Sequence, residues 1–251
     1  MGSNAFHRLD GPWIRRTGIP DAPDHGFPPL QSAPEGAGTS YHPRMAAPAP
    51  DRSPVDIRTD LEDMLADRRR RLETALADLD RNGPDLLAVV EAVGDVVRRG
   101  GRVVTCGNGG SAAEALHLSE ELLGRYRTDR PSIASTCLNA DPTAITCIAN
   151  DFGFEAIFSR QCESLLQPGD GLVVFTTSGR SPNLVRALQT AADRGATRIG
   201  FLGGDGGEAR PLCDASITIA GPDSAAIQEV HQFVMHAACE QFEPAPETHG
   251  R

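Results

Sequence analysis

The sequence predicts an α/β fold in which a five-stranded parallel sheet lies between two layers of helices. Two observations predict it. Short apolar runs rich in β-branched residues recur along the chain, and segments with helical spacing of apolar residues separate them. A nearly continuous apolar strand is buried on both faces, which parallel sheets achieve through helices that cross over each face. We therefore expect a three-layer α/β/α domain preceded by N-terminal helices.

Two amphipathic helices are expected before the first strand. The first runs from about Asp56 to Asp80 and ends at Asn82-Gly83-Pro84. Asp85 is then expected to cap a second helix, which Gly100-Gly101 stops. The apolar residues of the first helix recur at helical spacing among many charges: Leu61, Met64, Leu65, Leu72, Ala75, Leu76 and Leu79.

Five apolar runs follow and are expected to form the strands of the sheet. In chain order they are Val103-Val104, Ile133 to Cys137, Leu172 to Phe175, Ile199 to Leu202 and Ala215 to Ile219. Ligands of such sheets bind where the loops leave the carboxyl ends of the strands. The loops after these runs are therefore where functional residues are sought.

Composition divides the chain into a leader, one domain and a short tail. Residues 1–54 hold ten of the 19 prolines and no sustained apolar period, so disorder is predicted there. Residues 55–243 are expected to form a single domain, and residues 244–251 a C-terminal tail.

Charge and cysteine usage exclude several classes of protein. A formal net charge of −10 disfavours a nucleic-acid-binding surface, because phosphate backbones repel an acidic protein. Nothing approaches the roughly 18 uninterrupted apolar residues of a membrane span. The six cysteines are scattered without a CxxC pair, which is typical of reduced, mostly buried thiols. A soluble, cytoplasmic protein is expected.

The loop from Cys106 to Ser111 is rich in glycine and lies between a strand and a helix expected to begin near Ala112. Its glycines permit positive φ, and the backbone N–H groups at a helix start attract an anion. An ordinary tight turn would explain the same residues. Asn108, Gly109, Gly110 and Ser111 are the candidate phosphate contacts.

A second loop of this kind follows the third strand, before a helix expected from about Asn183. Thr176, Thr177, Ser178 and Ser181 supply four hydroxyls, and capping of that helix would need only one of them. Two such loops on neighbouring strands indicate a phosphorylated ligand. A dinucleotide or a nucleoside triphosphate is less favoured, because an acidic residue after the second strand and a Walker lysine are both missing.

Candidate acid, base and metal-binding groups lie on two helices. His117 and Glu121 are four residues apart and share one helix face. On the last helix, four side chains fall within a narrow arc: Gln228, His231, Gln232 and His236. Together they could form a mixed zinc site if the two helices meet. The alternative is that these histidines are ordinary core or surface residues, and periodicity does not decide between the two.

The run from Cys106 to Leu122, CGNGGSAAEALHLSEEL, resembles the signature of the phosphoheptose isomerases, which have the flavodoxin-like SIS sugar-isomerase fold. The resemblance continues through Ala149–Phe154, Phe158–Gln161, Thr177–Asn183 and Ile227–His231, and it covers about residues 56–243. It implies an enzyme that converts sedoheptulose 7-phosphate to D-glycero-D-manno-heptose 7-phosphate through an enediol.

The resemblance also implies roles for single residues. Glu121 matches the family's base and His236 its acid, while Asn150 and Asp151 match residues that contact the sugar chain. The two loops would bind substrate at a subunit interface of a homotetramer, with Gln228 beside them. Zinc, one ion per subunit, would be held by His117, Glu121, Gln228 and His236.

Three residues depart from the family's usual pattern: Arg180 stands for an asparagine, Thr176 for a serine and Glu114 for an aspartate. Arg180 could bind a phosphate at a different reach or be a solvated side chain. A longer ketose phosphate of the octulose 8-phosphate type, in secondary metabolism, therefore stays an alternative substrate. A non-catalytic SIS adaptor is a second alternative, but such relatives lack the glutamate and the final histidine that are present here.

Overall fold

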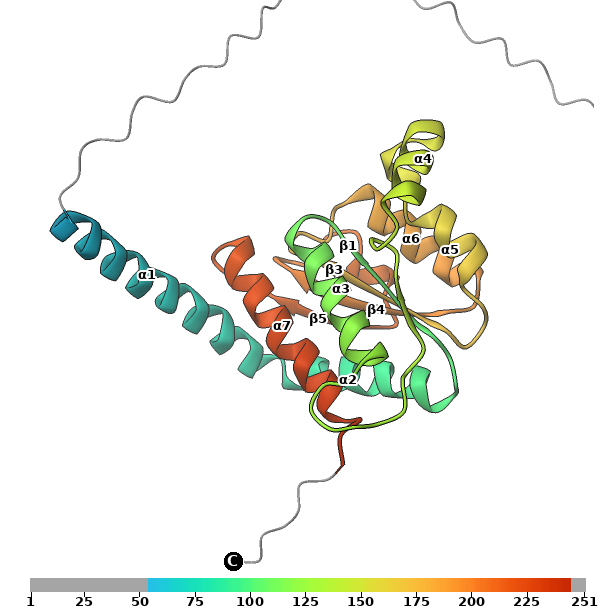
Figure 1. Ribbon diagram of the computed structural model, residues 1–251, viewed down its shortest axis with the longest axis horizontal. Coiled ribbons are helices and arrows are strands. Elements are labelled where there is room, and N and C mark those ends of the chain that lie inside the picture. The colour runs from blue at the N-terminus through green and yellow to red at the C-terminus, as the bar shows by residue number, and fades with distance from the viewer. Residues whose placement is uncertain (1–53, 245–251) are drawn as a thin grey trace, which may run out of the picture. The chain divides into compact units, whose positions relative to one another are not determined.

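The structure is a computed structural model that describes residues 54–244. The leader predicted for residues 1–54 and the tail predicted for residues 244–251 thus lie, but for one residue each, outside the described residues. The chain runs through its elements in the following order: α1 (Pro54–Arg81), α2 (Gly83–Arg98), β1 (Val103–Gly107), α3 (Gly110–Leu123), β2 (Ser135–Cys137), α4 (Pro142–Phe152), η1 (Phe154–Ala156), α5 (Ser159–Leu165), β3 (Gly171–Thr176), α6 (Pro182–Asp193), β4 (Thr197–Gly203), η2 (Arg210–Leu212), β5 (Ala215–Ile219) and α7 (Ser224–Glu240) (Figure 1).

The five strands form one parallel sheet in the order β2-β1-β3-β4-β5, which confirms the predicted sheet. From β1 the chain crosses to β2 on one side, and β3 then pairs with β1 on the other side. The loops after β1 and β3 therefore leave neighbouring carboxyl ends at the point where the strand order reverses. Ligands of open α/β sheets bind at such a point.

The alternation of side chains along each strand builds two separate cores. In β3, Val173 and Phe175 pack under α2, α3 and α7, whereas Leu172 and Val174 pack under α5 and α6. All six residues of β3 are buried. The sheet is thus covered on both faces, as its apolar strands require, and Figure 1 shows the resulting layers.

Several element boundaries differ from the predicted ones. Asp85 was expected to cap α2, and this was wrong: α2 begins at Gly83, with Asn82 at the N-cap position and Asp85 in the first turn. Pro84 belongs in that first turn because it has no N–H to leave unbonded. The side chain of Asn82 donates instead to the carbonyl of Asp78 at the end of α1.

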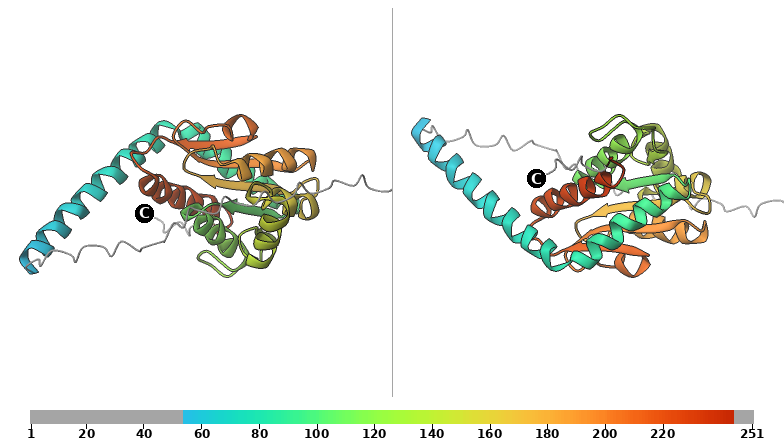
Figure 2. Two further views of the ribbon diagram at one scale, coloured as in Figure 1. Left: turned by 90° about the horizontal axis from the view of Figure 1, so that it is seen from above. Right: turned by 90° about the horizontal axis from the view of Figure 1, so that it is seen from below.

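The second half of α1 packs against the core of the domain. Leu72, Leu76 and the buried residues Ala75 and Leu79 join the core, and the helix is tied to α7 by ion pairs. In the first half, Leu61, Met64 and Leu65 are about half exposed. Figures 1 and 2 show this half of α1 running beyond the sheet. Apolar side chains that stay half exposed among residues 54–244 indicate a surface that another segment or another molecule covers.

The cysteines behave as small apolar residues rather than as a reactive set. All six are free, and four are buried. Burial raises the pKa of the Cys106 thiol, and it raises that of Cys162 to about 12, so both stay protonated at neutral pH. Within residues 54–244, no helix is long and apolar enough to cross a membrane.

Candidate active site

A small cavity of about 90 Å³ opens between the loops that follow β1 and β3. This volume is well below that of a pocket for a drug-sized ligand, so it suits one end of a sugar phosphate rather than the whole molecule. Side chains from four segments line it: Asn108, Ser111, Phe175, Thr176, Thr177, Ser178, Ser181, Leu184 and Gln228. Both predicted phosphate loops therefore contribute to a single pocket.

The two loops are joined by a reciprocal pair of side-chain amides. Asn108 donates to Asn183 and Asn183 donates back to Asn108, each over 2.9 Å. Asn183 is only 2% exposed, and it stands in the first turn of α6. Asn183 lies in the run Thr177–Asn183 that resembles the phosphoheptose isomerases. Its bond to Asn108 could not be predicted, because the sequence does not show that the two loops touch.

The first loop carries its phosphate candidates onto the start of α3, which begins at Gly110, two residues earlier than expected. Gly109 has φ +58°, a left-handed conformation that glycine adopts without strain. Ser111 is nearly buried and lines the cavity. The peptide dipoles of α3 give its start partial positive charge, which favours a phosphate group there.

In the second loop the four hydroxyls play different parts. Thr176 accepts bonds from the backbone N–H groups of Ser178 and Gly179, so it shapes the loop. The hydroxyl of Thr177 lies 3.2 Å from that of Ser224 at the start of α7. Ser181 occupies the N-cap position of α6 but makes no capping bond. Its hydroxyl is therefore not used for capping, which favours the ligand-binding interpretation.

Arg180 does not reach toward the cavity as a phosphate ligand would. Its guanidinium pairs with Asp205 at 2.6 Å and donates to the carbonyl of Ser178, and its side chain is 55% exposed. The side-chain bond from Arg180 lowers the pKa of the Asp205 carboxyl below its ordinary value. Arg180 thus braces the hydroxyl loop against the loop after β4.

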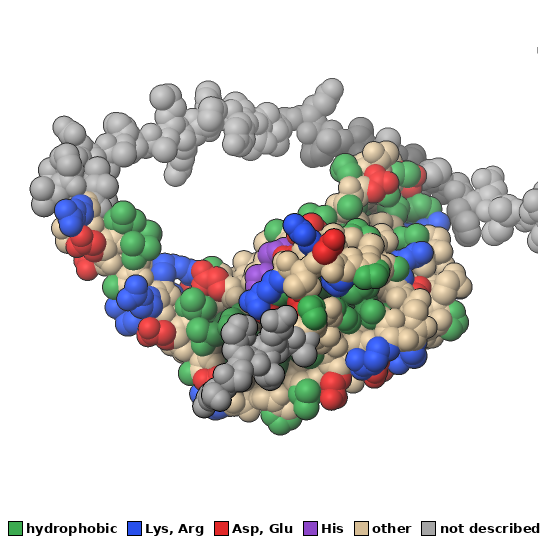
Figure 3. All heavy atoms as spheres, turned by 60° about the horizontal axis from the view of Figure 1, so that its bottom comes forward, with side chains coloured by type: hydrophobic (Ala, Val, Ile, Leu, Met, Phe, Trp, Pro, Cys, Tyr) green, Lys and Arg blue, Asp and Glu red, His purple; other side chains and the backbone are tan. Residues whose placement is uncertain are grey.

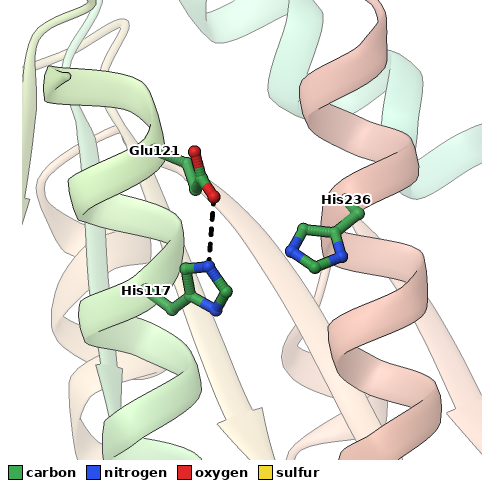
Figure 4. A group of neighbouring side chains, drawn as sticks. All are labelled: His117, Glu121 and His236. Atoms are coloured by element: carbon green, nitrogen blue, oxygen red, sulfur yellow. Dashed lines mark hydrogen bonds and ion pairs between the residues drawn. The ribbon is translucent and has the colours of Figure 1, made fainter. Parts of the chain in front are cut away.

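Helices α3 and α7, which both supply residues to this cavity, also bring three titratable side chains together. His117 and Glu121 come from one face of α3, and their Nε2 and Oε1 atoms lie 3.1 Å apart. His236 faces them from α7, with its ring edge-on to that of His117 at 5.2 Å between centroids (Figure 4). The two helices therefore meet as the predicted site required. Figure 3 shows histidine side chains at the surface, bordered by basic and acidic groups.

The donor set of this cluster fits zinc. The candidate ligand atoms of His117, Glu121 and His236 all lie within 4.8 Å of one another. Two imidazoles and a carboxylate on rigid helices are typical of zinc sites that keep a fourth position open for another ligand. Gln228, the fourth predicted ligand, lines the phosphate pocket, where a side chain at Gly110 would strike its amide.

His231 is a core residue, although the sequence places it in the same arc of α7 as Gln228 and His236. It is fully buried, and its Nε2 atom lies 3.0 Å from the carbonyl oxygen of Leu202 in β4. Its Nδ1 atom lies 3.8 Å from Oε1 of Glu114, a buried glutamate on α3. Neither Glu114 oxygen has a hydrogen-bond partner. His231 and Glu114 therefore lie between α3 and α7 in the core and form no part of the metal cluster.

Two predicted sugar contacts lie apart from the cavity. Asn150 and Asp151 are exposed on α4, where Asn150 donates to the carboxylate of Asp151 over 2.8 Å. No residue of α4 is buried. The single chain thus brings together the loop, acid, base and metal candidates, and it leaves the α4 pair outside the cavity lining.

The family profile described as "SIS domain" matches residues 69–203. The chain is 39% identical over 187 residues to the phosphoheptose isomerase of Pelobacter propionicus, a match that covers 74% of this chain and 97% of that protein. It is 46% identical over 138 residues to that of Nitratiruptor sp., covering 55% of this chain and 74% of that protein.

Solved structures agree with the sequence comparison. The phosphoheptose isomerase of Neisseria gonorrhoeae superposes with a TM-score of 0.66 at 31% identity, covering 74% of this chain and 97% of that one. The phosphoheptose isomerase of Francisella tularensis gives a TM-score of 0.68 at 29% identity, with 72% and 96% coverage.

Proposed function

We propose that this chain, which belongs to the SIS-domain family and within it to the phosphoheptose isomerases, interconverts sedoheptulose 7-phosphate and D-glycero-D-manno-heptose 7-phosphate. One observation carries the proposal. Helices α3 and α7 each supply residues both to the phosphate pocket and to the acid and base cluster beside it. A ligand held by its phosphate would thereby present its other end to Glu121 and His236.

The reaction moves a proton between two adjacent carbons of the sugar. We assign Glu121 as the base that takes the proton from the carbon beside the carbonyl and returns it to the neighbouring carbon. His236 donates a proton to the carbonyl oxygen as the enediol forms, and it takes a proton back from the hydroxyl oxygen on the adjacent carbon as that carbon becomes the aldose carbonyl. The bond between His117 and Glu121 holds the carboxylate on the side of α3 that faces His236.

We propose one zinc ion per subunit at this cluster, held by His117, Glu121, His236 and Gln228. The donor set and the close approach of the first three residues support the assignment. Bound there, the ion would polarise the carbonyl and stabilise developing negative charge. A carboxylate that also binds metal is a weaker base, so the ion and the proton compete for Glu121.

We also propose that the chain works as a homotetramer in which α4 of one subunit brings Asn150 and Asp151 to the site of another. The absence of any buried residue on α4 supports this, as do apolar side chains about half exposed on several helices. They are Leu61, Met64, Leu65, Leu116, Leu123, Phe152 and Phe233. Residues 55–243 would form the catalytic domain, and the free cysteines suit a reducing cytoplasm.

Two other functions are weaker candidates. An isomerase for a longer ketose phosphate would need a phosphate contact farther from the acid and base. Arg180 is the candidate for that contact, but its guanidinium is already paired with Asp205. A non-catalytic SIS adaptor would have no use for an acid and base pair, whereas Glu121 and His236 face each other here.

Two matched variants separate the base from the metal. Glu121→Gln removes the base together with a zinc ligand, so we expect turnover to fall by a factor of about 10²–10⁴ and not to recover when zinc is added. His117→Gln keeps the base and removes a ligand, so bound zinc per chain should fall and excess zinc should restore part of the turnover. Both variants should remain folded oligomers that bind the ketose phosphate. Turnover of Glu121→Gln at the level of the parent protein would exclude Glu121 as the base.

A further inference from the structure

The ring of His236 is held from two sides, and only one of them is a predicted site residue. His117 meets it edge-on, at an interplanar angle of 82°. On another side the ring of Tyr126 stacks against it, with centroids 5.4 Å apart and planes inclined by 29°. Aromatic rings at such distances attract each other in both edge-on and stacked arrangements. His236 is thus oriented by a neighbour that lies outside the acid, base and metal set.

Tyr126 is itself fixed from the far end of α7. The guanidinium of Arg127 lies 5.1 Å from the centre of the Tyr126 ring, and it pairs with Glu240 over 2.8 Å. Glu240 stands four residues after His236 and therefore one turn along the same helix. Tyr126 thus contacts α7 at His236, and Arg127 contacts it at Glu240. These two contacts fix the ring of Tyr126 against the ring of His236.

The segment that carries Tyr126 is anchored at both ends. Arg130 donates to the backbone carbonyls of Glu121 and Leu122, which satisfies acceptors at the end of α3. Thr128 donates its N–H to Glu243 after the end of α7. Residues 126–130 therefore form a bracket between the last turn of α3 and that of α7. Residues 126–130 therefore contact both the backbone of Glu121, the proposed base, and the ring of His236, the proposed acid.

We propose that Tyr126 is a positioning residue that holds the His236 imidazole in the rotamer from which it acts as the acid. The inference rests on the proposed function and adds to it a residue that need not touch substrate. Its ring is the part that matters, because the stack is with the ring face. We expect the hydroxyl group to be dispensable, because Arg127 ties the segment to Glu240 without it.

The experiment compares Tyr126→Phe, which keeps the ring, with Tyr126→Leu, which replaces it by an aliphatic side chain. We expect Tyr126→Phe to keep kcat within about twofold, and Tyr126→Leu to lose at least about tenfold in kcat with KM little changed, because the acid is misplaced while the phosphate pocket is intact. Equal kcat in Tyr126→Leu and the parent would overturn the proposal, as would equal losses in both variants.

A second readout does not depend on turnover. Hydrogen–deuterium exchange at the imidazole Cε1 atom of His236, followed by mass spectrometry of the peptide, reports how well the ring is covered. The exchange should be faster in Tyr126→Leu than in the parent and in Tyr126→Phe, and the same rate in all three would contradict the stack. If the parent turns over no ketose phosphate, the proposed function fails, whereas this comparison still tests the position of His236.

Discussion

At the scale of single residues, the buried pair Glu114 and His231 explains how α3 and α7 are held face to face. A carbonyl oxygen can only accept, so the Nε2 atom of His231 carries the proton that it donates to Leu202. Its Nδ1 atom lies 3.8 Å from Oε1 of Glu114, which is longer than a hydrogen bond. The imidazole and the carboxyl group are therefore buried neighbours between the two helices, and a change in one is expected to affect the other.

This arrangement predicts a coupled effect on stability. His231→Leu removes the buried imidazole that bonds to the carbonyl of Leu202 and lies 3.8 Å from the Glu114 carboxyl, and we expect it to lower the free energy of unfolding by about 3 kcal/mol. Adding Glu114→Leu to that variant should recover much of the loss, since an apolar pair needs no polar partner in the core. Urea unfolding of the two single variants and the double variant measures the coupling. Additive losses in the double variant would show that the two side chains do not interact.

Residue types alone could predict much of the site but not its assembly. The glycine loop, the hydroxyl loop and the i, i+4 pair His117 and Glu121 are readable because each is local in the sequence. The role of Tyr126 and the burial of His231 depend on how closely α3 approaches α7. Periodicity places both His231 and His236 on α7 without showing which of them faces the core.

At the scale of elements, one carboxylate both caps α7 and joins it to α1. Asp223 caps α7 by accepting from the N–H of Ala226, and it also pairs with Arg71 of α1. The bond from Ala226 is the main cause that lowers the pKa of Asp223, with smaller contributions from Arg71 and Arg68. A carboxyl whose pKa is lowered by folding stabilises the protein above its unfolded pKa, and this stabilisation is lost as pH falls through the folded value.

Two substitutions at this position separate the cap from the charge. Asn is also a good N-cap, so Asp223→Asn should lose only the ion pairs with α1, whereas Asp223→Ala should lose the cap as well. At neutral pH we expect the melting temperature to fall in the order parent, Asp223→Asn, Asp223→Ala. The gap between the parent and Asp223→Asn should close as pH falls through the lowered pKa of the Asp223 carboxyl, where that group becomes protonated. A gap that is constant with pH would assign the effect to packing.

The elements also show where local sequence is sufficient. All five strands are predictable because a strand buried on both faces is an apolar run, and the order of the sheet then follows from the crossovers. Boundaries are less predictable: Ile133 lies before β2 rather than in it, because its N–H bonds to Leu122 at the end of α3. Such a bond joins segments that only the folded chain brings together.

At the scale of the whole molecule, most candidate site residues lie together in one chain, whereas several apolar side chains are left exposed on its surface. The phosphate pocket and the cluster of His117, Glu121 and His236 lie within one subunit. Within residues 54–244, Leu61, Met64 and Leu65 in the first half of α1 are about half exposed, and α4 has no buried residue. A closed oligomer would cover these apolar faces and would bring Asn150 and Asp151 to a neighbouring site.

The most direct test is an isomerase assay with the purified protein. Sedoheptulose 7-phosphate and, separately, a longer ketose phosphate are added, and formation of the aldose phosphate is followed by NMR. We predict turnover of the seven-carbon substrate, in preference to the longer one. Formation of aldose only from the longer substrate, or from neither while the protein binds both, would contradict the assignment as a phosphoheptose isomerase.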